Sequence, residues 1–138
     1  MASGRSKADT GHAIQAAARL DHLVLLLLLT KLNRPQISTR AAKKLDSFAK
    51  RIRLARALSL IDHVTHSDLK TINDVRVVFA HAELPVRFTS APVRIKARRF
   101  GGWKPQASAR RLFDEAVARA EAAISARTNL LIYDASGA

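Results

Sequence analysis

The segment Lys96–Lys104 combines cations with two aromatic residues, which is typical of a nucleic-acid contact. Its sequence is Lys-Ala-Arg-Arg-Phe-Gly-Gly-Trp-Lys, so its cations attract phosphates, while Phe100 and Trp103 can stack on an unpaired base. The alternative is that both aromatic side chains anchor the segment to a hydrophobic core. The sequence leaves both interpretations open.

Positive charge is concentrated in two segments of this chain of 138 residues, whose formal net charge is +13. Nine Lys and Arg against one acid, Asp46, lie between Lys31 and Arg56, and eight against none lie between Arg87 and Arg111. Such segments predict a positive surface that attracts nucleic acid or another polyanion, although a merely solubilising surface has the same composition. The residues that we expect to contact nucleic acid are Lys43, Lys44, Arg51, Arg98, Arg99, Trp103 and Lys104.

Arg76 falls on the apolar side of a predicted helix, between Ile72 and Phe79. Because a guanidinium stays charged at any accessible pH, it cannot enter a core without acceptors. We therefore expect it beside carbonyl oxygens, a ligand anion, or a carboxylate such as that of Asp21 or Asp62.

Two histidines, His63 and His66, lie three residues apart and close to Asp62 and Asp68. The pattern resembles a metal site, but polar residues are equally expected at a turn, and we predict no metal. The chain has no cysteine, which excludes disulfides and thiolate ligands. It also lacks a glycine-rich phosphate loop, a serine nucleophile elbow and a paired-carboxylate signature, and we expect no cofactor.

Apolar residues recur at helical spacing along most of the chain, which positions all of these side chains on helices or in the loops between them. The pattern predicts helices over residues 10–32, 48–60, 65–81 and 106–131, with a short helix from about Ser90 to Arg99. Asp46 or Ser47 is the expected N-cap of the second helix, and Thr65-His66-Ser67-Asp68 is a near capping box for the third.

The predicted fold class is all-α, a compact bundle of about four to five helices. We expect a disordered N-terminus over residues 1–9, a single helical domain over residues 10–133 and a flexible tail over residues 134–138. The longest apolar run, Leu23–Leu29, is shorter than the roughly 20 residues of a membrane helix, and no small-residue cleavage site follows it. We therefore expect a cytoplasmic protein without a membrane span, whose apolar run lies inside the bundle or in a dimer interface.

Two central stretches carry a family resemblance: SFAKRIRLARALSLI, from Ser47 to Ile61, and DLKTINDVRVVFAH, from Asp68 to His81. A phenylalanine-led helix with lysine, isoleucine and a leucine-alanine pair, followed by an aspartate-leucine and a helix ending in phenylalanine-alanine-histidine, resembles the mannitol operon repressor family. The resemblance covers roughly Ser47 to Val93. That family is similar to the HEPN superfamily of helical proteins, so the resemblance implies a HEPN-like bundle that is often dimeric.

Many HEPN members are metal-independent ribonucleases that use an arginine and a histidine separated by four to six residues. The resemblance puts Arg76 and His81 at these positions, where histidine would move a proton and arginine would stabilise a phosphorane-like charge. Two features depart from active members. Val77 stands where a polar residue, commonly asparagine, is usual, and residues five apart on an ideal helix point about 140° from each other.

Three functions follow as hypotheses. The first is a non-enzymatic transcriptional regulator like the mannitol operon repressors, a homodimer that acts through a regulatory protein partner and a basic surface facing nucleic acid. The second is a HEPN-type endoribonuclease that uses Arg76 and His81. The third is a general RNA- or DNA-binding module. A helix-turn-helix is excluded because Val75, Val77, Val78 and Phe79 make the second helix too apolar for a DNA groove.

Overall fold

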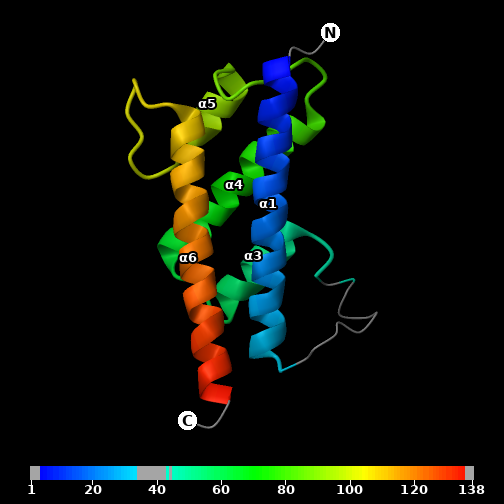
Figure 1. Ribbon diagram of the computed structural model, residues 1–138, viewed down its shortest axis with the longest axis vertical. Helices are drawn as coiled ribbons and strands as arrows, with labels where there is room; N and C mark the ends of the chain where they lie inside the picture. Colours follow the sequence, from blue (N-terminus) through cyan, green and yellow to red (C-terminus); the bar gives the residue numbers. More distant parts are fainter. Residues whose placement is uncertain (1–3, 34–42, 44, 136–138) are drawn as a thin grey trace.

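The protein is an all-helical bundle in a computed structural model that describes residues 4–33, 43 and 45–135 (Figure 1). The helices are α1 (Gly4–Lys31), α3 (Phe48–Ala57), α4 (His63–His81), α5 (Ala91–Ala97) and α6 (Ala109–Ala135), and the described residues contain no strand. The predicted all-α class with four to five helices is therefore confirmed.

The two longest helices, α1 and α6, lie side by side and run in the same direction (Figure 1). Helix α4 crosses obliquely and contacts both of them, and α3 packs against α1 and α4. Helix α5 lies at the end of the bundle where α1 and α6 begin, and packs on α4 and α6. The bundle is thus built around α1, α4 and α6, with the two shorter helices at its sides.

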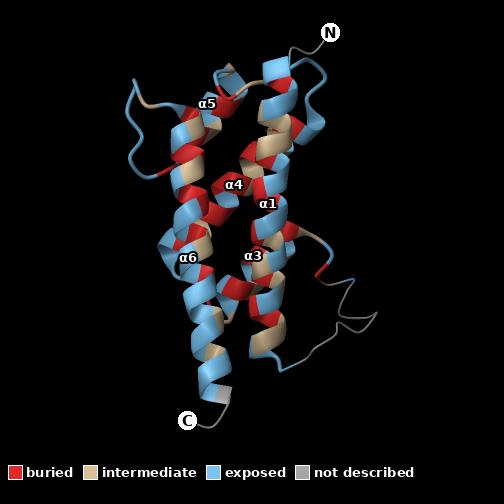
Figure 2. Ribbon diagram, in the orientation of Figure 1, coloured by how far each residue is buried: buried red, intermediate tan, exposed pale blue. Residues whose placement is uncertain are grey.

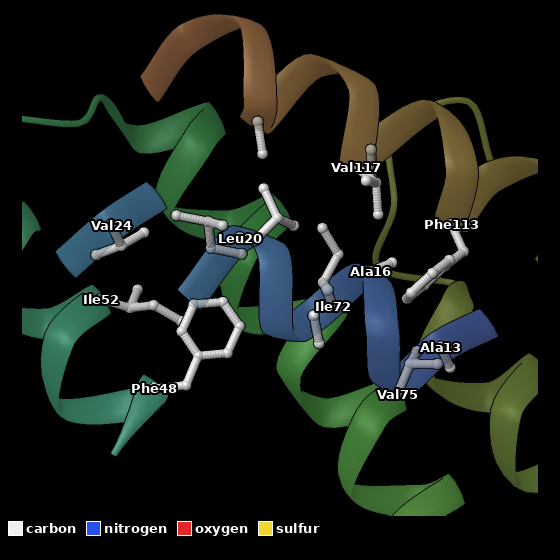
Figure 3. Close-up of a cluster of buried hydrophobic side chains, with 14 of the residues drawn as sticks. Ala13, Ala16, Leu20, Val24, Phe48, Ile52, Ile72, Val75, Phe113 and Val117 are labelled. Atoms are coloured by element: carbon white, nitrogen blue, oxygen red, sulfur yellow. The ribbon is translucent and has the colours of Figure 1, made fainter. Parts of the chain in front are cut away.

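One hydrophobic cluster holds these helices together, and its residues line the inward faces in Figure 2. Helix α1 contributes Ala13, Ala16 and Leu20, all at most 1% exposed, and α6 contributes alanines such as Ala116 and Ala120. Small side chains on both long helices let their backbones approach closely, while larger residues of α3, α4 and α6 fill the remaining space. Figure 3 shows Phe48, Ile52, Ile72, Val75 and Phe113 directed into this space.

The N-terminus is ordered earlier than the sequence predicts. Helix α1 begins at Gly4, so the expectation of disorder is wrong for residues 4–9. Ser6 is buried and its hydroxyl donates to the carbonyl oxygen of Val86 at 3.0 Å, while Asp9 accepts from the backbone N–H of Phe88, also at 3.0 Å. These bonds to a distant loop fix a segment whose own composition favours disorder. At the other end, α6 continues through Ala135, so the predicted tail is helical at residues 134 and 135, and its residues 136–138 lie outside the described residues.

The helix caps agree with the sequence in one place and differ in another. Ser47 is the N-cap of α3, because its hydroxyl accepts from the backbone N–H of Lys50 at 3.2 Å. The capping box predicted at residues 65–68 is wrong: α4 begins at His63, and Asp62 accepts from the backbone N–H of Thr65 at 2.8 Å. That hydrogen bond also lowers the pKa of Asp62. Helix α3 ends at Ala57, short of the predicted Leu60, before a turn in which Ser59 has a φ of 58°.

Helix α1 is long and apolar enough to cross a membrane by length and composition, the one such helix in the described ranges. The prediction considered only the uninterrupted run Leu23–Leu29 and missed this property of the whole helix. In the fold, 39% of the most apolar window of α1 is buried, and the helix contacts α3, α4 and α6. Leu20, Val24, Leu27 and Leu28 are fully buried in the core, whereas Ile14 and Leu26 are 37% and 40% exposed.

A charged pair joins α4 to α6 inside this packing. The side chain of Asp68 is 7% exposed and accepts hydrogen bonds from both Nε and Nη2 of Arg119, each at 3.1 Å. Hydrogen bonding to Asp68 also raises the pKa of Arg119. The pair thus satisfies a buried carboxylate that would otherwise lack a partner.

The substitution Asp68→Asn should lower the free energy of unfolding by about 1–3 kcal/mol, because an amide replaces the buried carboxylate that accepts both hydrogen bonds from Arg119. Urea denaturation at neutral pH measures this. Asp74→Asn is the matched control, since its partner Arg99 has a side chain that is 59% exposed, and it should cost less than about 1 kcal/mol. Equal losses in the two variants would contradict a structural role for the buried pair.

Candidate nucleic-acid interface

A cluster of phenylalanine rings positions α5 and the loop that follows it. The ring of Phe88 lies 5.0 Å from that of Phe79 and 5.3 Å from that of Phe113, measured between centroids. Phe100, in the loop after α5, lies 6.3 Å from Phe113 and is 3% exposed. For Phe100, the anchoring interpretation is therefore the one that holds.

His12 completes this cluster, and the sequence analysis missed it. Its ring lies about 6 Å from those of Phe88 and Phe113, and its Nε2 lies 2.6 Å from a carboxylate oxygen of Asp114. The guanidinium of Arg110 lies 5.4 Å from the Phe88 centroid and also donates to Asp114. No sequence motif marks these residues, which come together only because α1 and α6 are neighbours.

A shallow groove of about 320 Å³ runs between α5 and the loop after it. Its lining consists of Ala91, Arg94, Ile95, Arg98, Trp103 and Pro105. Unlike Phe100, Trp103 is 38% exposed, and the guanidinium of Arg98 lies 5.8 Å from the Trp103 ring centroid. Gly102 has a φ of +83°, a conformation that side chains disfavour, in the turn just before Trp103. Gly102 thus allows the turn that brings the tryptophan to the groove.

Positive charge around the groove is not neutralised. Arg94 donates to the carbonyl oxygen of Pro105 at 3.4 Å, and no acidic residue lines the groove. Among the described residues, no ion pair involves Arg94, Lys96, Arg98 or Lys104. Arg99 differs, because it pairs with Asp74 at 3.1 Å. Cations and an exposed aromatic ring therefore share one surface.

The other predicted nucleic-acid contacts lie elsewhere. Lys43 is exposed in the connection before α3, and Lys44 lies outside the described residues. Arg51 is partly buried: it donates to the carbonyl oxygen of Leu45 at 2.7 Å and to Asp21 at 2.8 Å. The Arg51 guanidinium thus links α3 to α1, and these hydrogen bonds make it less available to a phosphate.

Arg76 does not make the ion pair expected of it. Its Nε donates to the side-chain oxygen of Asn73 at 3.0 Å, in a hollow bordered by α1 and α3. Asp21 pairs with Arg51, and Asp62 caps α4. The predicted ion pair with Asp21 or Asp62 is therefore wrong. Arg76 is nevertheless partly buried, and the side-chain oxygen of Asn73 is the acceptor of its hydrogen bond.

His81 is the last residue of α4 and is exposed. Within the described part of the chain, no hydrogen bond joins it to Arg76, which borders the hollow beside α1 and α3. Arg76 and His81, the two residues of the ribonuclease hypothesis, are therefore not hydrogen-bonded to each other within one chain.

His63 and His66 lie in the first turn of α4, and the two acids near them have other structural roles. Asp62 caps the helix and Asp68 binds Arg119. In the described ranges, no three His, Asp or Glu side chains are grouped to hold a metal. Burial, together with the positive charges of Arg56, Lys70 and His63, lowers the pKa of His66.

No family model, curated protein or solved structure matches the chain. Its class is therefore defined by its own geometry: a small all-α bundle that carries a cationic groove with an exposed tryptophan. The groove residues Arg94 and Ile95 did not figure among the predicted contacts. The eight cations without an acid between Arg87 and Arg111 were the signal that could have indicated Arg94.

The depressed pKa of His66 predicts a pH-dependent stability. Because the folded state holds this histidine below its usual pKa of 6.5, the unfolded state binds the proton more readily. The contribution of His66 to stability is therefore present above pH 6.5 and is lost as the pH falls below that value. The urea midpoint should therefore drop more between pH 7.5 and pH 5.5 in the wild type than in His66→Gln.

His22→Gln, at an exposed position of α1, controls for the loss of one titrating side chain and should show the same drop as the wild type. If the drop in His66→Gln is also as large as in the wild type, His66 is not the source of the pH dependence.

Proposed function

We propose that this protein is a non-enzymatic regulator of transcription that binds nucleic acid through the surface around α5. The observation that carries the proposal is the set of cations without acidic partners, Arg94, Arg98 and Lys104, beside an exposed Trp103. Phosphate binding draws its affinity from such cations, because each contact releases counterions from the nucleic acid. The resemblance to mannitol operon repressors favours regulation as the use of this binding.

Protein contacts are the second part of the proposal. The last turns of α6 leave Leu130 and Ile132 more than half exposed, at 56% and 54%. They lie at the end of the bundle opposite α5 (Figure 1). Exposed apolar residues on a helix that extends past the core support a second copy of the chain or a regulatory protein as partner. In each subunit of a cytoplasmic homodimer, nucleic acid would then bind at the α5 end of the bundle. The protein partner would bind at the opposite end, on the last turns of α6.

Binding should fall steeply with salt, with a log–log slope of about 0.7 to 0.9 per phosphate neutralised. In the double variant Arg94→Ala/Arg98→Ala, the slope should decrease by roughly one per cation removed. Fluorescence anisotropy with labelled oligonucleotides between 50 and 200 mM salt, concentrations at which such effects are large, measures both. The matched control is Lys31→Ala/Arg127→Ala, which removes two exposed cations from the two long helices and leaves the groove intact. Equal losses in both double variants would show that net charge, and not the α5 surface, drives binding.

The alternative function is a HEPN-type endoribonuclease, and one observation favours it. His81 is exposed at the end of α4, where an RNA can reach it. Against it, Arg76 is hydrogen-bonded to Asn73, and Val77, in place of a polar residue, provides no group to position a ribose. A second chain would have to supply the missing part of the site.

We expect purified protein to leave total RNA intact in the presence of EDTA. Within one chain, His81 as acid-base group and Arg76 as phosphate-binding group are not hydrogen-bonded to each other. Gel analysis of RNA incubated with the wild type and with His81→Ala tests this. Cleavage by the wild type that disappears in His81→Ala would replace the regulator proposal with the ribonuclease.

A further inference from the structure

We infer that the groove beside α5 binds an unpaired base stacked on Trp103, so that the protein selects single-stranded nucleic acid over a duplex. This inference rests on the proposed function, because it specifies which form of nucleic acid the same surface binds.

The composition of the groove provides the first argument. Its floor and walls include Ala91, Ile95, Trp103 and Pro105, and Ile95 and Trp103 are 56% and 38% exposed. A duplex keeps the faces of its bases stacked inside and presents phosphates and base edges, which gain nothing from an apolar wall. An unpaired base offers a flat apolar face that fits this lining.

The second argument is the position of the cations relative to the ring. Arg94 lies on α5 and Arg98 is the C-cap residue that directly follows it, and both line the groove, with the Arg98 guanidinium 5.8 Å from the Trp103 centroid. In a nucleotide the sugar links the phosphate to the base, so a base that stacks on the Trp103 ring brings its phosphate close to these guanidinium groups. An aromatic platform beside cations that follow the backbone is the arrangement by which proteins bind single strands without sequence preference.

The third argument is that the backbone of the loop that carries the tryptophan is anchored to the core. Phe100 is buried against Phe113, and the backbone N–H of Trp103 donates to the carbonyl oxygen of Phe100 at 3.4 Å. The turn between them uses Gly102 in its left-handed conformation. A loop whose backbone is anchored in this way loses less conformational entropy on binding than a free loop, which favours affinity.

An acidic peptide is the competing occupant, since it also pairs with Arg94 and Arg98. It has no need of a flat aromatic surface, and the exposed ring would then be incidental. The two ligands therefore differ in their dependence on Trp103.

Trp103 is the only tryptophan of the chain, so its fluorescence reports on the groove without a label. The full-length protein is titrated with oligo(dT), oligo(rU), a blunt-ended DNA duplex and poly-glutamate at one fixed salt concentration. We expect both single strands to quench the fluorescence and the duplex and poly-glutamate to quench it little. The two single-strand arms show whether the ligand is DNA or RNA.

Affinities measured by anisotropy separate stacking from charge. Trp103→Ala should weaken single-strand binding roughly 5- to 100-fold and leave binding of the blunt-ended duplex nearly unchanged. Trp103→Phe keeps an aromatic face and should retain most of the affinity. Circular dichroism and the urea midpoint confirm that both variants fold, since Trp103 lies outside the buried core.

The outcomes distinguish this inference from the proposed function. Salt-dependent binding of single strands without quenching, and without loss of affinity in Trp103→Ala, overturns base stacking and leaves the proposed function intact. Equal quenching by poly-glutamate shows that the groove recognises charge alone, which also overturns the inference. If no nucleic acid binds at any salt concentration, both the inference and the proposed function fail.

Discussion

Burial of four phenylalanine rings at one end of the bundle is the constraint on which the rest of this end depends. Phe79, Phe88, Phe100 and Phe113 come from α4, the loop before α5, the loop after α5, and α6. Each aromatic pair contributes about 0.5–1.5 kcal/mol beyond the burial of its area. The cluster holds both loops that flank α5, so the short helix is positioned from both sides. A helix of seven residues has too few hydrogen bonds to be stable alone, and this packing explains its presence.

The distribution of charge follows from how few acids the chain has. It contains 11 Asp and Glu against 24 Lys and Arg, and several of the acids serve the fold. Asp68 binds Arg119, Asp21 binds Arg51, and Asp9 accepts from the backbone of Phe88. Because these carboxylates are committed to connections between helices, the excess of positive charge remains on surfaces such as that of α5. A strongly cationic chain can thus use its few acids between elements of the fold and keep an unneutralised groove.

The same bundle is compatible with more than one activity, since fold and function separate easily. What distinguishes the hypotheses is local chemistry. A ribonuclease requires a proton donor and a phosphate-binding cation in one place, and here His81 is exposed at a helix end while Arg76 is bonded to Asn73. A binding protein requires an accessible ring beside unpaired cations, and Trp103 with Arg98 meets that requirement. The proposed binding function rests on this arrangement of Trp103 and Arg98.

The sequence by itself determined the helices, because helical periodicity and helix breakers are local properties. It narrowed the N-cap of α3 to Asp46 or Ser47, of which the structure has Ser47, and it predicted the short helix that includes Pro92. Only the tertiary structure decided which arginine binds Asp21, because Arg51 and Arg76 both lie near it and the packing of α3 on α1 favours Arg51. It also decided that Phe100 is buried and Trp103 exposed, and that residues 4–9 are helical. Such outcomes depend on partners far along the chain, as Asp68 depends on Arg119, and periodicity does not encode which distant side chains meet.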